Sequence, residues 1–292
     1  MNQSTPVKQM EWTGERLVTD PSLGKGIIEH LHRYAICLKL VEGKTVLDIA
    51  SGEGYGTNLL AHYAAHAQGV DISMEAIAHA KQKYAKPNVA FKEGSATKIP
   101  CPSHSLDVVV SFETIEHHDQ HEAMMLEVKR VLKNDGILII STPERDNYRK
   151  VDPDNLHHIK ELTGLEFNML LNKHFLTVDM YHQHYVHGSF ITPAQGKAGN
   201  EFLEYNGNFE SVQEAQFGNN NIYNIAICSN GNLPFSVNQS IFNGAENLQL
   251  FYSTIMENHS HQVKQAVYNT KAYKLGRLLL RPLSFMKKYF KQ

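Results

Sequence analysis

A glycine-rich turn flanked by two carboxylates is the feature of this sequence best suited to holding a small ligand. The turn reads G-x-G-x-G over residues 52–56; Asp48 lies in the apolar run before it, and Asp71 ends the next apolar run roughly twenty residues later. Glycines allow the backbone to approach a ligand closely. A carboxylate at Asp71 can accept both hydrogens of a ribose diol, or can instead cap a helix. Asp48 would be unfavourable beside a pyrophosphate but suits an ammonium or sulfonium group.

Residues able to move a proton follow a Val-rich run at 106–111. His117 is the first candidate for a general base, because the neighbouring Glu113 and Glu116 can orient it and raise its basicity. His118 is the second candidate, and the pair at 157–158 is the third. A structural or solvated role is the alternative for each histidine.

The elements that must position these residues alternate between strand and helix patterns. Such alternation predicts an α/β fold: a doubly wound, mostly parallel seven-stranded sheet with helices on both faces. Ligands bind such sheets outside the carboxyl ends of the strands. The expected strands are Thr45–Ala50, Ala67–Ile72, Val89–Lys92, Leu106–Ser111, Ile137–Ser141, Phe175–Tyr181 and Ile222–Cys228. The expected helices are 27–41, 55–65, 73–84, 119–132 (from an Asp119-x-x-Glu122 capping box) and 163–172 (from Thr163-x-x-Glu166).

Four motifs occur in the same order as in a known family. They are the glycine turn, Asp71, the Glu93-Gly94-Ser95-Ala96 segment, and the run from Val108 to His118 with the later Ser141-Thr142-Pro143. From about Thr45 to Pro143 the chain resembles the class I S-adenosylmethionine-dependent methyltransferases, which have a Rossmann-like fold. The flanking stretches at 13–18, 30–34 and 155–162 resemble the branch that methylates bacterial O-antigens and other surface polysaccharides.

The resemblance implies roles for individual residues in binding S-adenosyl-L-methionine. Gly52 and Gly54 would admit the methionine part and Asp48 would face its amino group, while Asp71 would hold the ribose. The remaining implied contacts are Ile72 and Ala96 on the adenine, Ser95 as its polar neighbour where the family often has Asp, Phe112 and Glu113 on the methyl-transfer face, and Arg33 on the methionine carboxylate. For Arg33 the alternative is a surface arginine on an amphipathic helix.

The predicted function is O-methylation of a sugar in a surface polysaccharide or lipid-linked glycan. Aromatic residues such as Tyr148, Tyr181, Tyr185 and Phe190 could stack on sugar faces, or simply pack in the core. One alternative is a methyltransferase for a quinone or other small metabolite. Alternatives of another class are an NAD-linked oxidoreductase, disfavoured by Thr57 and Asp48, and a non-catalytic cofactor-binding module. No metal ligand is predicted, because neither His117-His118-Asp119-x-His121 nor His182-x-His184-x-x-His187 fits a closed zinc pattern. The resemblance leaves a need for a divalent ion open, since some sugar-ring and catechol methyltransferases use one.

Composition sets the remaining expectations. Hydrophobic residues make up 42% and charged residues 20% of the 292 positions, as in a soluble globular protein, and cytoplasmic localisation is predicted. Eight basic residues and no acid follow Glu257, so the rest of the chain is acidic and unsuited to nucleic acid.

The basic, leucine-rich tail at 271–291 suits the anionic inner face of a membrane, or packing on the domain or on a second subunit of a homo-oligomer. The predicted domains are an N-terminal lid and helix at 1–43, a methyltransferase domain at 44–230 and a helical, basic extension at 231–292. Whether Trp12 to Arg16 forms a lid or a packed strap is left open.

Overall fold

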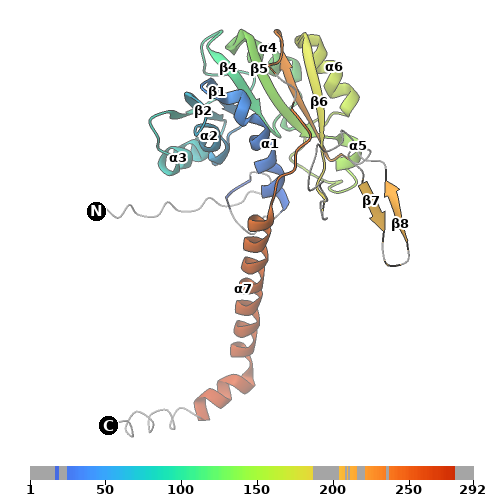
Figure 1. Cartoon of the computed structure of the whole chain (residues 1–292). Helices are drawn as coiled ribbons and strands as arrows, with labels where there is room; N and C mark the ends of the chain where they lie inside the picture. The colour runs from blue at the N-terminus through green and yellow to red at the C-terminus, as the bar shows by residue number, and fades with distance from the viewer. Residues whose placement is uncertain are drawn as a thin grey trace, which may run out of the picture. The chain divides into compact units, whose positions relative to one another are not determined.

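The structure is a computed structural model of the whole chain (Figure 1). The structure describes residues 17–19, 25–186, 204–207, 209, 211–215, 221–234 and 237–279. These fall into two compact units, one within residues 1–19 and 28–242 and the other within 20–27 and 243–292. The Trp12–Arg16 segment, Phe190 and the tail beyond residue 279 lie outside the described residues.

The first unit contains a seven-stranded sheet in the order β3-β2-β1-β4-β5-β9-β6. Its strands are β1 (Thr45–Ile49), β2 (His66–Asp71), β3 (Val89–Glu93), β4 (Leu106–Ser111), β5 (Leu132–Pro143), β6 (Thr177–Gln183) and β9 (Tyr223–Ser229). Six strands run in the same direction, and β9 alone runs antiparallel, to its neighbours β5 and β6. The predicted doubly wound, mostly parallel sheet is therefore confirmed. The chain order reverses between β1 and β4, which is where such sheets bind ligands.

Helices cover both faces of this sheet because neighbouring strand residues point to opposite sides. Leu47 and Val109 belong to a core cluster with residues of α4 and α6, whereas Val46 and Val108 belong to a second cluster with residues of α1 and α2. The strands are thus apolar on both faces, as buried parallel strands require. The helices are α1 (Lys25–Val41), α2 (Tyr55–Leu60), α3 (Met74–Lys83), α4 (His121–Val131), α5 (Arg145–Tyr148) and α6 (Gly164–His174), with a 3-10 turn η2 (Ile115–His117).

Local sequence explains where two of the helices begin. The hydroxyl oxygen of Ser73 accepts a hydrogen bond from the N–H of Ala76 at 3.2 Å and so caps α3. Before α6, Thr163 and Glu166 form both hydrogen bonds of a capping box, as the sequence predicts.

The predicted capping box before α4 is wrong. That helix begins at His121, and its N-cap residue Gln120 makes no side-chain capping bond. The carboxylate of Glu122 instead contacts Lys173 at 2.6 Å and His174 at 2.8 Å on α6. Glu122 therefore forms a tertiary contact between two helices instead of the hydrogen bond to the backbone that the local sequence pattern predicts.

Two other element boundaries differ from prediction. α2 ends at Leu60 rather than Ala65, because the Asn88 amide donates to the carbonyl oxygens of Ala61 and Ala64 and stabilises a turn there. β5 begins at Leu132 rather than at Ile137 and ends at Pro143. A short hairpin, β7 (Glu204–Gly207) with β8 (Val212–Ala215), lies in the polar insertion between β6 and β9.

The second unit is dominated by α7 (Ala245–Asn269), followed by helical residues 271–279. Many of its large apolar side chains are exposed, including Leu250, Met256, Leu275 and Leu278. Within the described part of the chain, every helix falls short of the length and hydrophobicity that a membrane crossing requires.

Candidate functional site

The glycine turn after β1 has a backbone that only small residues tolerate well. Gly52 has φ of 53° and Gly54 has φ of 91°, and the alanine before the turn, Ala50, also has a positive φ of 57°. A Cβ added at Gly54 would lie 2.8 Å from the Cβ of Ala80. The turn therefore depends on glycine both for its backbone conformation and for its close packing on α3.

Asp48 lies under this turn as a buried carboxylate, 1% exposed. It accepts hydrogen bonds from the hydroxyls of Thr57 at 2.7 Å and Tyr34 at 3.2 Å. Burial raises the pKa of Asp48 to about 7, and the two hydrogen bonds oppose that rise. Thr57, which occupies the place of the third glycine in a dinucleotide turn, thus holds the carboxylate that shapes the loop.

Asp71 ends β2 and links the glycine turn to the start of α3. Its two carboxylate oxygens accept from the backbone N–H groups of Gly52 and Ser73, each at 2.8 Å. Each oxygen has a second lone pair, so this arrangement is compatible with the predicted ribose contact. The next residue, Ile72, is 77% exposed, which is unusual for a large apolar side chain at a sheet edge and fits a surface that an adenine would cover.

The other predicted adenine contacts differ in their surroundings. Ala96 packs against the core cluster beside α4. The hydroxyl oxygen of Ser95 accepts from the backbone N–H of Thr97 at 3.2 Å and also contacts the hydroxyl of Thr97 at 3.0 Å. Ser95 therefore stabilises its own loop. Phe112, on the neighbouring strand end, is buried with its ring edge-on to Tyr34 at 5.1 Å.

Arg33 is not a surface residue, so that alternative is wrong. Its side chain is 1% exposed, donates to Oε1 of Gln183 at 2.6 Å, and stacks over the ring of Tyr223 at 4.7 Å. Burial alone would lower the pKa of Arg33, but the nearby carboxylates, led by Glu113, raise it overall. Its Nε has no hydrogen-bond partner among the described residues, which leaves a buried donor available to an anionic ligand.

Glu53, inside the glycine turn, is a residue that the sequence interpretation missed. It is fully buried and forms an ion pair with Lys83 of α3. Its carboxylate also accepts from the backbone N–H of Thr19 at 2.6 Å and the Thr19 hydroxyl at 3.0 Å. Glu53 therefore ties the segment just after residues 12–16 to the turn. A charged residue between two glycines of a tight turn was the only local indication of such a role.

Two glutamates stand at the end of β4. Glu113 has φ of 48°, and its carboxylate accepts from the hydroxyl of Ser141 at 2.5 Å. A non-glycine residue in this conformation stores strain, which is common where side chains are aimed at a ligand. Glu116 is fully buried and accepts from the Thr142 hydroxyl at 3.2 Å. Burial, with Glu113 nearby, holds the pKa of Glu116 well above its usual range.

The candidate bases lie beside these glutamates. Nδ1 of His117 donates to the carbonyl oxygen of His157 at 3.0 Å, because a carbonyl can only accept. The ring of His117 meets that of His158 edge-on at 5.3 Å. Both ring nitrogens of His118 are buried without a hydrogen-bond partner among the described residues, and burial lowers its pKa. His117 therefore has a defined tautomer, with its lone pair on Nε2, whereas His118 has no polar partner that fixes one.

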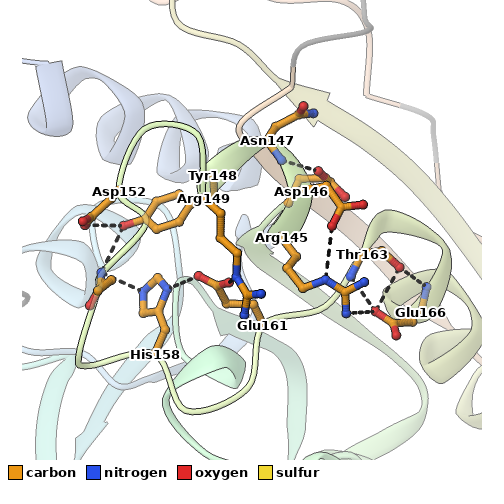
Figure 2. A network of polar contacts seen from close by, with 12 residues as sticks. Arg145, Asp146, Asn147, Tyr148, Arg149, Asp152, His158, Glu161, Thr163 and Glu166 are labelled. Carbon is orange, nitrogen blue, oxygen red and sulfur yellow. Dashed lines mark hydrogen bonds and ion pairs between the residues drawn. The ribbon is translucent and has the colours of Figure 1, made fainter.

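A polar network on the loop after α5 supports His158. Its Nδ1 donates to Glu161 at 2.8 Å, and Arg149 donates to the other oxygen of Glu161 at 2.7 Å. Figure 2 shows His158 and Arg149 on opposite sides of this carboxylate, with Tyr148 beside the imidazole. His157 and His158 rank third among the bases predicted from the sequence, because nothing local indicates that a loop forty residues away contacts His117.

Comparison with known proteins agrees with this arrangement. Residues 47–140 match the family model of the Methyltransferase domain. The chain is 36% identical over 131 residues to the Probable S-adenosylmethionine-dependent methyltransferase of Mycolicibacterium smegmatis, covering 44% of this chain and 50% of that protein. It is 29% identical over 140 residues to the Fatty-acid O-methyltransferase of the same organism, covering 44% and 51%.

A solved S-adenosylmethionine-dependent methyltransferase from Thermotoga maritima shares the fold, with a TM-score of 0.50 and 19% identity over 70% of this chain and 92% of that one. The chain spans about half the length of the curated relatives it matches. The name of the first of these relatives states dependence on S-adenosylmethionine. The exposed Ile72 and the glycine cradle beside Asp71 fit this cofactor.

Proposed function

We propose that this protein transfers a methyl group from S-adenosylmethionine to a hydroxyl of a sugar, in a bacterial surface polysaccharide or a lipid-linked glycan. The observation that carries the methyl-transfer part is the pair of carboxylates, Asp48 and Asp71, on either side of a glycine turn within the segment that matches the methyltransferase domain. When bound, the cofactor supplies a methyl group on a positively charged sulphur, which an acceptor oxygen can displace.

On the cofactor side, each residue has one proposed task. Asp71 holds the ribose, Ile72 covers the adenine, and the buried Arg33 pairs with the methionine carboxylate. Because the Nε of Arg33 is buried without a described partner, a carboxylate there would remove a desolvated donor. Gly52 and Gly54 keep the backbone close enough for their neighbours to contact the ligand.

On the acceptor side, the end of β4 supplies proton transfer. A sugar hydroxyl is a weak nucleophile, so a base beside it accelerates transfer. His117 is the proposed base, since the contact of its Nδ1 with the His157 carbonyl puts the lone pair on Nε2. His118, the second candidate, is disfavoured because burial lowers its pKa and weakens it as a proton acceptor. Glu113 is proposed to act electrostatically, through the negative charge of its carboxylate at the end of β4.

The saccharide acceptor is supported by polar and aromatic groups near the end of β4. Tyr148, His117 and His158 lie together on one side of this edge. A second candidate acceptor is a hydroxylated lipid, favoured by the similarity to a Fatty-acid O-methyltransferase. A carboxylate acceptor is already an anion and needs no base, so the histidine cluster favours a hydroxyl in either case.

Membrane attachment is a separate proposal that rests on the second unit. Its exposed leucines alternate with bases, an arrangement that suits an anionic lipid surface. The described residues that carry this pattern are Lys271, Lys274, Leu275, Arg277, Leu278 and Leu279. Packing of this helix on a second copy of the chain is the alternative.

Methyl transfer from labelled S-adenosylmethionine, screened against free sugars, lipid-linked glycans, hydroxylated lipids and quinones, tests the proposed function. We expect labelled ether products from a glycan acceptor. Label on hydroxylated lipids alone would replace the saccharide with the second candidate, and absence of label from every acceptor would contradict the activity itself.

A further inference from the structure

A cluster of side chains of the types that bind metals lies at the end of β4, beside the place where the acceptor is proposed to bind. We propose that Glu116, His117 and His158 bind one divalent transition-metal ion. The binding claim stands on the geometry of these side chains; the role assigned to the ion in catalysis rests on the proposed function.

The three donor atoms lie within 4.8 Å of one another, so small side-chain shifts would bring all of them within reach of a single ion. They come from two segments that the backbone joins firmly. The N–H groups of Ile159 and Lys160 both donate to the carbonyl oxygen of Glu116, at 2.8 and 3.0 Å. The loop that carries His158 is therefore fixed on the turn that carries Glu116 and His117.

Both histidines have the orientation typical of metal ligands. Nδ1 of His117 donates to a backbone carbonyl, and Nδ1 of His158 donates to the carboxylate of Glu161. Each contact puts the proton on Nδ1 and the lone pair on Nε2. A ligating histidine usually donates its other N–H to a carbonyl or carboxylate in this way. Glu161 is itself held by Arg149, as expected for a residue that orients a ligand.

Glu116 provides an independent reason to expect a cation. Its side chain is fully buried, and while Oε2 accepts from Thr142, Oε1 has no hydrogen-bond partner among the described residues. A buried carboxylate oxygen without a partner is rare in folded proteins. A bound cation would satisfy it. The amide of Asn155, which contacts Nε2 of His158 at 3.4 Å, would have to rotate away.

The ligand types select the kind of ion. Two imidazole nitrogens with one carboxylate oxygen suit Mn²⁺, Fe²⁺, Co²⁺, Ni²⁺ or Zn²⁺ better than Ca²⁺ or Mg²⁺, which prefer oxygen. Three protein ligands leave coordination positions for water or for an acceptor oxygen. The sequence-based prediction of no metal considered His117 only with His118 and His121, and Nε2 of His121 contacts the His118 carbonyl oxygen instead.

The ion would change the task of His117. As a ligand, Nε2 can no longer accept the proton of an acceptor hydroxyl. A divalent ion can instead orient that hydroxyl and lower its pKa, so that its proton passes to solvent water before the oxygen attacks. His117 can hold the ion or accept the proton, but it cannot do both at once, so methyl transfer measured with and without a chelator decides between the two roles.

The test uses the full chain, treated with a chelator and titrated with Co²⁺ by calorimetry and visible absorption. We expect one equivalent to bind with the absorption of a nitrogen- and oxygen-ligated ion. Glu116→Gln and His158→Gln should each abolish this site. Glu161→Gln keeps all three ligands and should weaken binding about 10–100-fold. His62→Gln, which changes an exposed histidine near α2, is the matched control and should bind Co²⁺ as the wild type does.

S-adenosylhomocysteine affinity, measured on every variant, shows whether each one has folded. Wild-type protein that binds no Co²⁺, Mn²⁺ or Zn²⁺, or folded Glu116 and His158 variants that bind as the wild type does, would overturn the proposal. Methyl transfer that persists unchanged in excess chelator would remove the ion's catalytic role and leave His117 as the base. Intact Co²⁺ binding without methyl transfer to any acceptor would instead contradict the proposed function.

Discussion

Replacing Asp48 by Asn should alter how the stability of this protein depends on pH. The carboxylate is buried beside the glycine turn, and burial raises its pKa from the ordinary 3.8 to about 7. Asn has nearly the same shape and keeps an oxygen that can accept from Thr57. The substitution therefore removes the titration while it preserves most of the packing.

The expected magnitude follows from the two pKa values. Between pH 3.8 and about 7 the folded protein holds a proton that the unfolded chain has released, so the free energy of unfolding falls as pH rises through this window. Each pH unit corresponds to about 1.4 kcal/mol, which gives at most ~4 kcal/mol across the window. Above about pH 8 the wild type carries the full cost of a buried charge, and Asp48→Asn does not.

Urea unfolding at several values between pH 5 and pH 9, followed by circular dichroism, measures this effect. The difference in free energy of unfolding between Asp48→Asn and wild type should increase with pH up to about 7 and then level off. Other titrating groups cancel in this difference. A difference that stays constant across the range would refute the assignment of a raised pKa to Asp48.

Three further substitutions test other parts of the account. Asp71→Ala should weaken S-adenosylhomocysteine binding by an order of magnitude or more in calorimetry, because a ribose diol would lose its acceptors; unchanged affinity would remove Asp71 from the site. Gly56→Ala should lower the free energy of unfolding by about 1–3 kcal/mol, since the added Cβ would lie 2.0 Å from Cζ of Tyr34; wild-type stability in urea would show that the ring moves aside freely. Thr163→Ala should cost about 1 kcal/mol by the same measurement, through loss of the capping box with Glu166; a neutral result would mean that packing alone fixes the start of α6.

The sheet was predictable because its determinants are local. Apolar runs such as 106–111 are buried on both faces and can only be central strands. The alternation of these runs with helical patterns leaves a parallel, doubly wound arrangement as the expected result.

Tertiary contacts account for the parts that local patterns missed. Glu122 contacts α6 rather than capping α4, and no local pattern indicates the partner of a long exposed side chain. For Arg33 the sequence left two possibilities, a contact with the methionine carboxylate or a surface position. It is buried, and its guanidinium donates to Gln183 and stacks over Tyr223, both far away in sequence. Glu53 was overlooked because its partners, Lys83 and Thr19, come from distant segments.

The candidate site shows the same division. One strand–turn–helix unit and the strand beside it contain Asp48, Gly52, Gly54 and Asp71. Their spacing in the sequence was therefore enough to predict that they lie together. The cluster around His117 forms only because the loop after α5 contacts the end of β4. Sequence spacing gives no indication of that contact. Contacts between distant segments therefore determine which groups surround the proposed acceptor at the end of β4. The groups around the proposed cofactor are determined by local sequence.

Calorimetric titration of the full chain with S-adenosylhomocysteine, and separately with NAD, tests the central claim most directly. The account predicts one equivalent of S-adenosylhomocysteine bound and no heat from NAD. Binding of NAD without binding of S-adenosylhomocysteine would contradict it, because the carboxylates beside the glycine turn would then serve a different ligand.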